Sequence, residues 1–205
     1  MQLLKVTEEA WPYLVAQRGA LDDMREDQVK WVQHYRAAIE SEFIAIRSYL
    51  PNACRTLLDV GAGMGGIDAL LNWHYGGHVK VILLDGIEDV PTVQKHNRTF
   101  NSMAIAERFL MANGVEYFAS VDANDSGAQV GELVDVVVSF KSWCFHIEPK
   151  RYIDRVRLAC HPGTQLFIDV RRGRDDWIAE LDKAFIICES VYAGRKHSCL
   201  RMVPR

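Results

Sequence analysis

The sequence lacks long apolar runs, regularly spaced cysteines and a surplus of basic residues, and each absence argues against a class of protein. No apolar stretch approaches the ~20 residues that span a bilayer, so we expect no membrane partner. The five cysteines are scattered without the spacing of a zinc site, a pattern typical of reduced thiols in the cytoplasm. The N-terminus has no basic region followed by an apolar run, so we predict no signal peptide and a cytoplasmic protein.

The charge balance gives no sign of a general affinity for nucleic acid. The formal net charge is −3 and the sequence pI is about 6.2, whereas proteins that bind a duplex usually carry a basic surplus. A chain of 205 residues can build one sizeable core, so we predict a single domain over residues 1–205. No group of residues has the pattern of a metal site, and nothing in the sequence indicates an oligomeric state.

The chain reads as a helical segment followed by alternating strands and helices. Residues 1–50 have helical spacing of apolar residues, with Thr7 and then Asp22 or Asp23 as helix caps. Beyond them the pattern predicts strands at 56–60, 79–84, 115–121, 134–138 and 164–170, with helices at 66–76, 101–113, 149–160 and 175–184. A loop is expected at 86–98, and a turn at 161–163. Residues 186–191 and 198–203 are predicted to form an antiparallel hairpin.

The most informative segment is the run from Leu57 to Asp68. An apolar strand carrying Asp59 is followed by Gly61, Gly63 and Gly65, and then by the apolar start of a helix. Glycines there let the backbone turn tightly and approach a ligand. Asp85 closes the next apolar strand, where a carboxylate can accept hydrogen bonds from a ribose. This order predicts a cradle for a cofactor that carries a nucleoside.

The acid-x-Gly-x-Gly-x-Gly run resembles motif I of the class I S-adenosylmethionine-dependent methyltransferases. The resemblance implies an α/β fold for residues 51–205. The expected core is Rossmann-like and doubly wound, with a mainly parallel seven-stranded sheet, helices on both faces and an antiparallel C-terminal hairpin. Residues 1–50 are expected to form an N-terminal helical cap. The implied cofactor is S-adenosylmethionine, held by Asp59, Gly61, Ala62, Gly63, Gly65, Asp85, Gly86, Asp122, Ala123 and Ser139.

By this resemblance the cofactor-binding residues divide among three strand ends. Asp59 and the glycine loop face the methionine part, and Asp85 binds the ribose hydroxyls. Asp122 accepts a hydrogen bond from the adenine amino group, and the next backbone amide, that of Ala123, meets a ring nitrogen. Asp122 in a simple turn is the alternative.

The segment after the fourth strand should lie beside the transferred methyl group. His146 is the preferred general base because an imidazole titrates near neutral pH, and Glu148 is a second candidate. Their alternatives are a packed or capping histidine and an acid favoured by a helix N-terminus. Lys141, Trp143 and Arg171 are candidate substrate-binding residues; the alternatives are a buried Trp143, since buried aromatics are commoner, and a solvated Lys141 or Arg171.

The favoured function is methyl transfer from S-adenosylmethionine to a small polar acceptor at oxygen, because the segment lacks the motifs of amino-directed enzymes. Methylation of nucleic acid or a modified nucleotide is the alternative. A nicotinamide-dependent reductase is weaker, although Tyr192 and Lys196 have the Tyr-x-x-x-Lys spacing of short-chain dehydrogenases. A non-catalytic cofactor-binding protein also stays open.

Overall fold

The computed structural model describes residues 3–17, 28–86 and 101–205. Its strands are β1 (Thr56–Val60), β2 (Lys80–Asp85), β3 (Phe118–Asp122), β4 (Val134–Ser139), β5 (Cys160–Arg171), β6 (Phe185–Ala193) and β7 (His197–Pro204). Its α-helices are α1 (Trp11–Gln17), α2 (Gln28–Ile46), α3 (Gly66–His74), α4 (Met103–Ala112), α5 (Ile153–Ala159) and α6 (Asp175–Ala184). Short 3-10 helices cover Arg47–Tyr49 (η2) and Pro149–Arg151 (η3).

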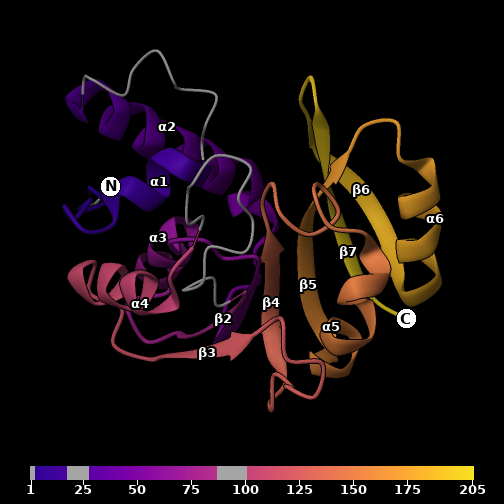
Figure 1. The fold of residues 1–205 in the computed structure, drawn as a ribbon. Helices are drawn as coiled ribbons and strands as arrows, with labels where there is room; N and C mark the ends of the chain where they lie inside the picture. The colour runs from indigo at the N-terminus through magenta and orange to yellow at the C-terminus, as the bar shows by residue number, and fades with distance from the viewer. Residues whose placement is uncertain (1–2, 18–27, 87–100) are drawn as a thin grey trace.

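The seven strands form one sheet in the order β3-β2-β1-β4-β5-β7-β6. Strands β1 to β5 are parallel to one another, and β7 is inserted antiparallel between β5 and β6. The predicted Rossmann-like sheet, including its antiparallel C-terminal hairpin, is therefore confirmed. Parallel strands need helical crossovers, which place helices on both faces of the sheet (Figure 1).

Two hydrophobic clusters separate the two faces. One cluster joins residues of α1, α2, α3 and α4 to the sheet, and the other joins residues of α5 and α6 to the opposite face. The side chains of a strand alternate between the faces, so Leu57 belongs to the first cluster and Leu58 to the second. The sheet is thus the middle layer of three, and its strand ends remain at the rim.

The helical cap packs directly on the first face. Trp31, Tyr35 and Ile39 of α2 are buried in the same cluster as residues of β1 and α3. Thr7 accepts a hydrogen bond from the Ala10 amide, 3.3 Å from its hydroxyl oxygen, just before α1, as its predicted capping role requires. The predicted caps Asp22 and Asp23 and most of the predicted loop 86–98 lie outside the described residues.

The predicted turn at 161–163 is wrong, because these residues belong to β5. The register between β4 and β5 shifts there: Val134 pairs with Cys160, but Val136 pairs with Gln165. The chain accommodates the extra residues locally. The His161 amide donates to the Thr164 hydroxyl (2.9 Å), and the Thr164 hydroxyl donates to the Val134 carbonyl (2.6 Å). Pro and Gly residues are found at irregularities within strands as well as in turns, so the sequence alone did not distinguish the two.

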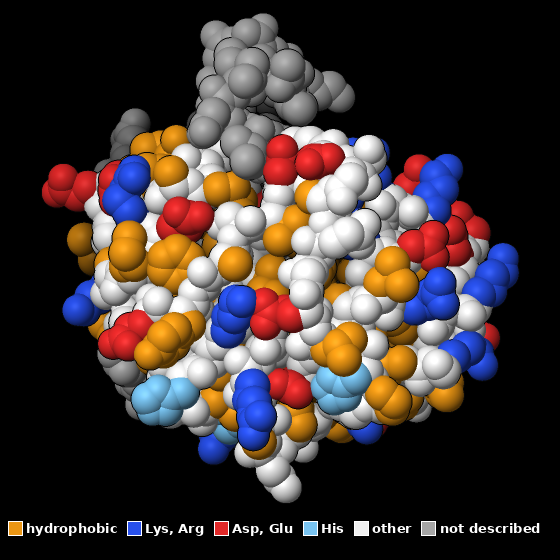
Figure 2. Space-filling model, turned by 90° about the horizontal axis from the view of Figure 1, so that it is seen from below, with side chains coloured by type: hydrophobic (Ala, Val, Ile, Leu, Met, Phe, Trp, Pro, Cys, Tyr) orange, Lys and Arg blue, Asp and Glu red, His pale blue; other side chains and the backbone are white. Residues whose placement is uncertain are grey.

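The predicted helix at 149–160 is divided. Pro149 begins η3, and α5 starts only at Ile153 after a residue with non-helical angles at Tyr152. None of the described helices is long and apolar enough to cross a membrane. On the face seen in Figure 2, basic and acidic side chains are interspersed rather than gathered by sign.

Candidate functional site

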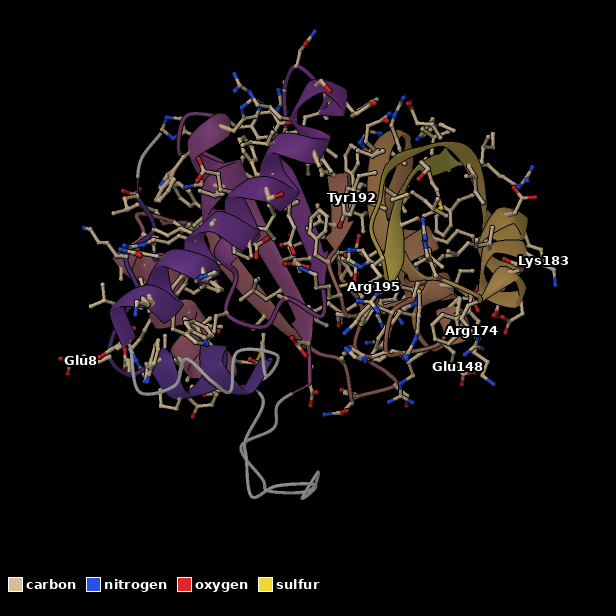
Figure 3. All side chains as sticks on the ribbon, turned by 90° about the horizontal axis from the view of Figure 1, so that it is seen from above. Glu8, Glu148, Arg174, Lys183, Tyr192 and Arg195 are labelled. Atoms are coloured by element: carbon tan, nitrogen blue, oxygen red, sulfur yellow. The ribbon has the colours of Figure 1, made fainter. Side chains whose placement is uncertain are left out.

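The sheet reverses its direction of growth between β1 and β4. From β1 the chain builds outward to β2 and β3, and then crosses to β4 on the other side. In open parallel sheets this point leaves a crevice outside the carboxyl ends of the strands, where ligands bind. Figure 3 looks onto that edge of the molecule, with α2 on one side and the β6–β7 hairpin on the other. The candidate site lies here.

The glycine loop after β1 has the backbone that its sequence demands, but its first glycine serves a different contact. Gly61 has a φ of 77°, a conformation that residues with a Cβ rarely adopt. A Cβ added there would lie 1.7 Å from the Ser142 hydroxyl oxygen. The space beside Gly61 is therefore filled by the segment after β4, and not kept open for a ligand as expected. The loop continues through a turn in which the Gly65 amide donates to the Ala62 carbonyl (3.0 Å).

Two carboxyl groups are buried together beneath this loop. Asp59 of β1 is 3% exposed, and Asp68 in the first turn of α3 is fully buried. Burial and the charge of Asp68 raise the pKa of Asp59 well above its usual range, and burial raises the pKa of Asp68 to about 7. Neither oxygen of Asp68 has a hydrogen-bond partner among the described residues. Asp59 was predicted from the sequence, and Asp68 was not.

Asp85 at the end of β2 is held by the two glycine segments beside it. The Gly63 amide donates to one carboxylate oxygen and the Gly86 amide to the other, both at 2.7 Å. These two hydrogen bonds fix the orientation of the Asp85 carboxylate. The structure thus brings Asp85 against the glycine loop, and its role toward a ribose stays a prediction.

The strand end at β3 fits the prediction less well. The Asp122 carboxylate accepts a hydrogen bond from the Asn124 amide (2.8 Å), which is the turn-forming alternative. The Ala123 amide was expected to meet an adenine nitrogen. It instead donates to the Asp85 carbonyl (2.8 Å) and so extends the pairing of β2 with β3. The Ala123 prediction is therefore corrected.

Two further predictions after β4 are also corrected. Ser139 is buried, donates to the Val60 carbonyl (2.6 Å) and accepts from the Trp143 amide (3.0 Å), so it joins strands and does not face a cofactor. Trp143 is fully buried and donates its indole N–H to the Pro149 carbonyl (3.1 Å). It is a core residue, as the alternative to its substrate role stated.

Both predicted catalytic residues lie toward the surface. His146 is exposed and packs edge-on against Phe145, with 4.6 Å between ring centroids. Partial burial, followed by the nearby charge of Arg171, lowers the pKa of His146. Glu148 is half exposed and pairs with Lys150 at 3.1 Å. In Figure 3, Glu148 lies next to Arg174 at the rim and away from Tyr192.

A hydrogen-bonded cluster whose histidine sequence reasoning missed lies at the ends of β5, β6 and β7. The Tyr192 hydroxyl donates to Asp169 Oδ1 (2.7 Å) and lies 3.0 Å from His197 Nε2. His197 Nε2 is also 3.3 Å from Asp169 Oδ2. Asp169 is fully buried, which raises its pKa to about 7, and burial lowers the pKa of His197. His197 Nδ1 is buried with no hydrogen-bond partner among the described residues.

Lys141 joins this cluster to the cap. Its amide donates to Asp169 Oδ2 (3.2 Å), and its Nζ pairs at 2.5 Å with Glu42, a buried acid of α2. Lys141 has a φ of 56°, so its backbone is strained into the left-handed region. The negative charge of Glu42 also raises the pKa of both Asp59 and Asp169. Glu42 is therefore close enough to both Asp59 and Asp169 for its charge to act on them.

Known structures share this architecture. StiE O-MT matches with a TM-score of 0.64 and 10% identity over 90% of this chain and 81% of its own. The glycopeptide N-methyltransferase MtfA, solved with S-adenosyl-L-methionine, has a TM-score of 0.58 and 12% identity over 80% and 93%. The ribosomal protein L11 methylase from Lactobacillus delbrueckii subsp. bulgaricus has a TM-score of 0.53 and 19% identity over 80% and 76%.

The chain has the class I methyltransferase fold. No protein-family model matches it, and no curated protein does. Because the identities are below 20%, the likeness concerns the fold and not the acceptor.

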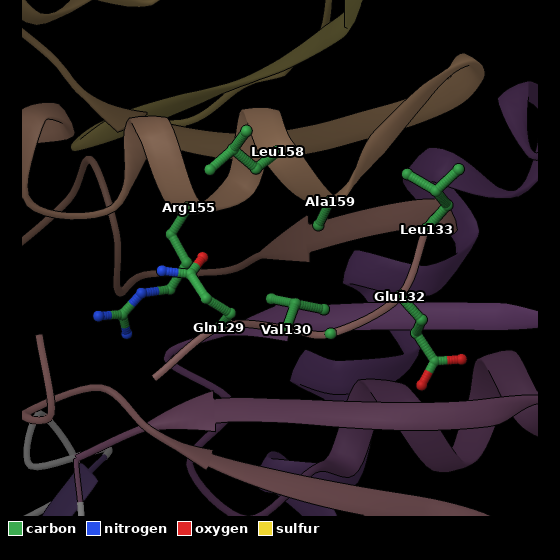
Figure 4. Close-up of a pocket in the computed structure, with 8 residues that line it drawn as sticks. Gln129, Val130, Glu132, Leu133, Arg155, Leu158 and Ala159 are labelled. Atoms are coloured by element: carbon green, nitrogen blue, oxygen red, sulfur yellow. The ribbon is translucent and has the colours of Figure 1, made fainter. Parts of the chain in front are cut away.

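Two surface cavities of this methyltransferase fold lie away from the candidate site. One, of about 270 Å³, is formed by residues 129–133 and α5 (Figure 4). The other, of about 610 Å³, is formed by residues 47–54 with His74 and Tyr75. Both lie beside the segments that precede β4 and β1, at the amino ends of these strands. The described residues contain no group of three or more His, Cys, Asp or Glu side chains that could hold a metal ion.

Proposed function

We propose that this protein is an S-adenosylmethionine-dependent methyltransferase that methylates a small polar acceptor at oxygen. The observation that carries the proposal is the buried pair of Asp59 and Asp68, whose oxygens lie beside the glycine loop. Buried charges are costly unless they are paired. Among the described residues neither acid has a cationic partner, so a ligand that supplies positive charge fits this site.

The same observation argues against a dinucleotide. An amino acid ammonium would favour the ionised forms of Asp59 and Asp68 and pair with them, whereas a pyrophosphate would find no positive charge there. Tyr192 and Lys196 support a reductase no better, because they lie on β6 and in the link that follows it. The Tyr192 hydroxyl donates its hydrogen bond to Asp169. The short-chain dehydrogenase pair requires one helical face, where residues four apart are neighbours.

In this proposal, different residues would bind different parts of the cofactor. Asp59 and Asp68 would hold the ammonium end, Asp85 the ribose hydroxyls, and Asp122 the adenine amino group. When bound, S-adenosylmethionine supplies a methyl group already activated on a sulfonium. The protein then needs to align the acceptor and take its proton.

We place the proton acceptor at His197 and not at His146. If Nε2–H donates to Asp169, the lone pair of His197 lies on Nδ1, where the described residues provide no donor. A carboxylate that orients an imidazole in one tautomer is a recurrent arrangement for a general base. Asp169 and Tyr192 would act through His197, and they are positioning residues in this proposal.

The experiment that tests the cofactor assignment is calorimetric titration of the purified chain with S-adenosylhomocysteine and, separately, with NADH. We expect micromolar binding of S-adenosylhomocysteine alone, weakened at least tenfold by Asp68→Asn. The matched control is Asp154→Asn, which neutralises an exposed acid of α5 and should bind normally. Binding of NADH alone would reinstate the reductase, and equal affinity in Asp68→Asn and the wild type would exclude the carboxyl pair from the site.

A further inference from the structure

A set of basic residues lies at the rim beside Asp169, Tyr192 and His197, which we call the Asp169 cluster. Arg171 ends β5, Arg172 follows it, and Arg195 and Lys196 form the link between β6 and β7. The two segments are tied together, because the Arg172 amide donates to the Lys196 carbonyl (3.0 Å). We call Arg171, Arg172, Arg195 and Lys196 the basic rim.

None of the four cations of the basic rim has a carboxylate partner in the part of the chain that the structure describes. Within residues 3–17, 28–86 and 101–205, no carboxylate lies within ion-pair distance of any of its four members. The neighbouring Arg174 differs, because it pairs with Asp176 at 2.7 Å and stacks on Trp177. Uncompensated cations that cluster in this way raise the local positive potential and attract anions.

The basic rim is continuous with the interior of the candidate site. Arg171 pairs in register with His197, and it lies two residues after Asp169, so both of these β5 side chains project from the same face. The Arg171 guanidinium lies 5.7 Å from the centre of the Phe145 ring, whose edge also faces His197 with 5.6 Å between centroids. In Figure 3, Arg195 lies between Tyr192 and Arg174.

The two ends of the site therefore differ in their charged groups. Asp59 of β1, Asp68 of α3 and Glu42 of α2 are buried acids at one end, and the basic rim lies beyond the Asp169 cluster at the other. A cation such as a sulfonium would occupy the acidic end. A ligand that reaches from there to the rim would be favoured if its far end were anionic. Arginine forks bind phosphate and carboxylate groups well because their donors match the geometry of the oxygens.

We infer that the methyl acceptor is a small molecule that carries a phosphate or carboxylate group, and that the basic rim binds this group. That the bound molecule is a methyl acceptor rests on the proposed function, whereas the anion site itself does not. The acceptor hydroxyl would then lie toward His197, and the anion would orient it.

The test is a titration of ¹⁵N-labelled protein with inorganic phosphate, and separately with acetate, at constant ionic strength. We expect saturable shifts of the amides at 171–173 and 194–196, with millimolar affinity for at least one anion. The double variant Arg172→Gln/Arg195→Gln should lose at least fivefold in affinity. The control variant Arg157→Gln/Lys183→Gln removes the same charge from α5 and α6 on the other face of the sheet and should bind as the wild type does.

The outcomes separate this inference from the proposed function. Shifts spread over all surface cations, or equal loss in the two double variants, would overturn the basic rim as an anion site. Titration of the same samples with S-adenosylhomocysteine should give equal affinities in all three proteins. Absence of that binding, with phosphate still localised at the rim, would overturn the proposed function and leave the anion site standing.

A third arm tests the size of the ligand. The affinity for a 20-nucleotide single strand should be no higher than the affinity for separate phosphate groups predicts. Submicromolar binding that falls steeply with salt and disappears in Arg172→Gln/Arg195→Gln would overturn the small-molecule assignment, because cooperative neutralisation of several phosphates is typical of a nucleic-acid surface.

Discussion

Asp68 shows how one buried residue can oppose the stability of the fold. Burial raises its pKa to about 7, so the folded protein binds a proton that the unfolded chain releases at a pKa of about 3.9. Because the folded state holds more protons, the contribution of this group is fully favourable below the unfolded pKa. It is lost as the pH rises toward and through 7. The same sign applies to Asp169.

We predict that Asp68→Asn increases the free energy of unfolding of the ligand-free protein at pH 8 by about 1–3 kcal/mol, since one pKa unit corresponds to ~1.4 kcal/mol. The gain should shrink toward pH 5, where the carboxyl is protonated. Urea unfolding at pH 5, 6.5 and 8 measures both effects. Asp154→Asn serves as the exposed control, and a loss of stability in Asp68→Asn at pH 8 would contradict the assignment of an unpaired buried acid.

At the scale of elements, the loop after β1 and the segment after β4 are fitted to each other. Gly61 combines a positive φ with a contact to Ser142 that excludes a Cβ. We predict that Gly61→Ala destabilises the protein by about 1–3 kcal/mol, through both strain and the clash. Adding Ser142→Gly should restore only the part due to the clash. Thermal unfolding of the two variants and of the Ser142→Gly control separates the contribution of backbone strain from that of the clash. Full restoration of stability would show that the positive φ at position 61 causes no strain in alanine.

The elements themselves were predictable to different degrees. The strand at 56–60 and the helix at 175–184 are found with the bounds that the sequence predicts, because apolar periodicity and flanking Gly, Pro or Asp signals agree there. The turn predicted at 161–163 is not found. A Pro-Gly pair indicates a turn unless pairing with a neighbouring strand supports extended backbone. That pairing, of β4 with β5, joins residues far apart in the chain.

For the whole molecule, the cap and the sheet share one hydrophobic cluster. Trp31, Ile39 and Phe43 of α2 are buried with Leu57 of β1 and Phe167 of β5. A cap that completes the core cannot unfold without exposing it. The pair of Glu42 and Lys141 adds a polar contact across the same boundary.

We therefore predict a single unfolding transition, in which tryptophan fluorescence and far-UV circular dichroism give the same midpoint in urea. Ile39→Ala should lower both midpoints together and cost about 2–4 kcal/mol, the range for truncating a buried aliphatic side chain. An early fluorescence change at a midpoint of its own would mean that the cap folds as a separate unit.

The sequence by itself determined the class of fold and the position of the glycine loop between β1 and α3. Local signals suffice for both, since strand, glycines, helix and closing acid lie within thirty residues of one another. Only the tertiary structure decided which side chains meet at the strand ends. Glu42, Asp169, Tyr192 and His197 come from four elements spread over the chain, and their pairing depends on the insertion of β7 beside β5. It also reassigned Ser139 and Trp143 from the site to the core, because burial depends on the packing of the whole sheet.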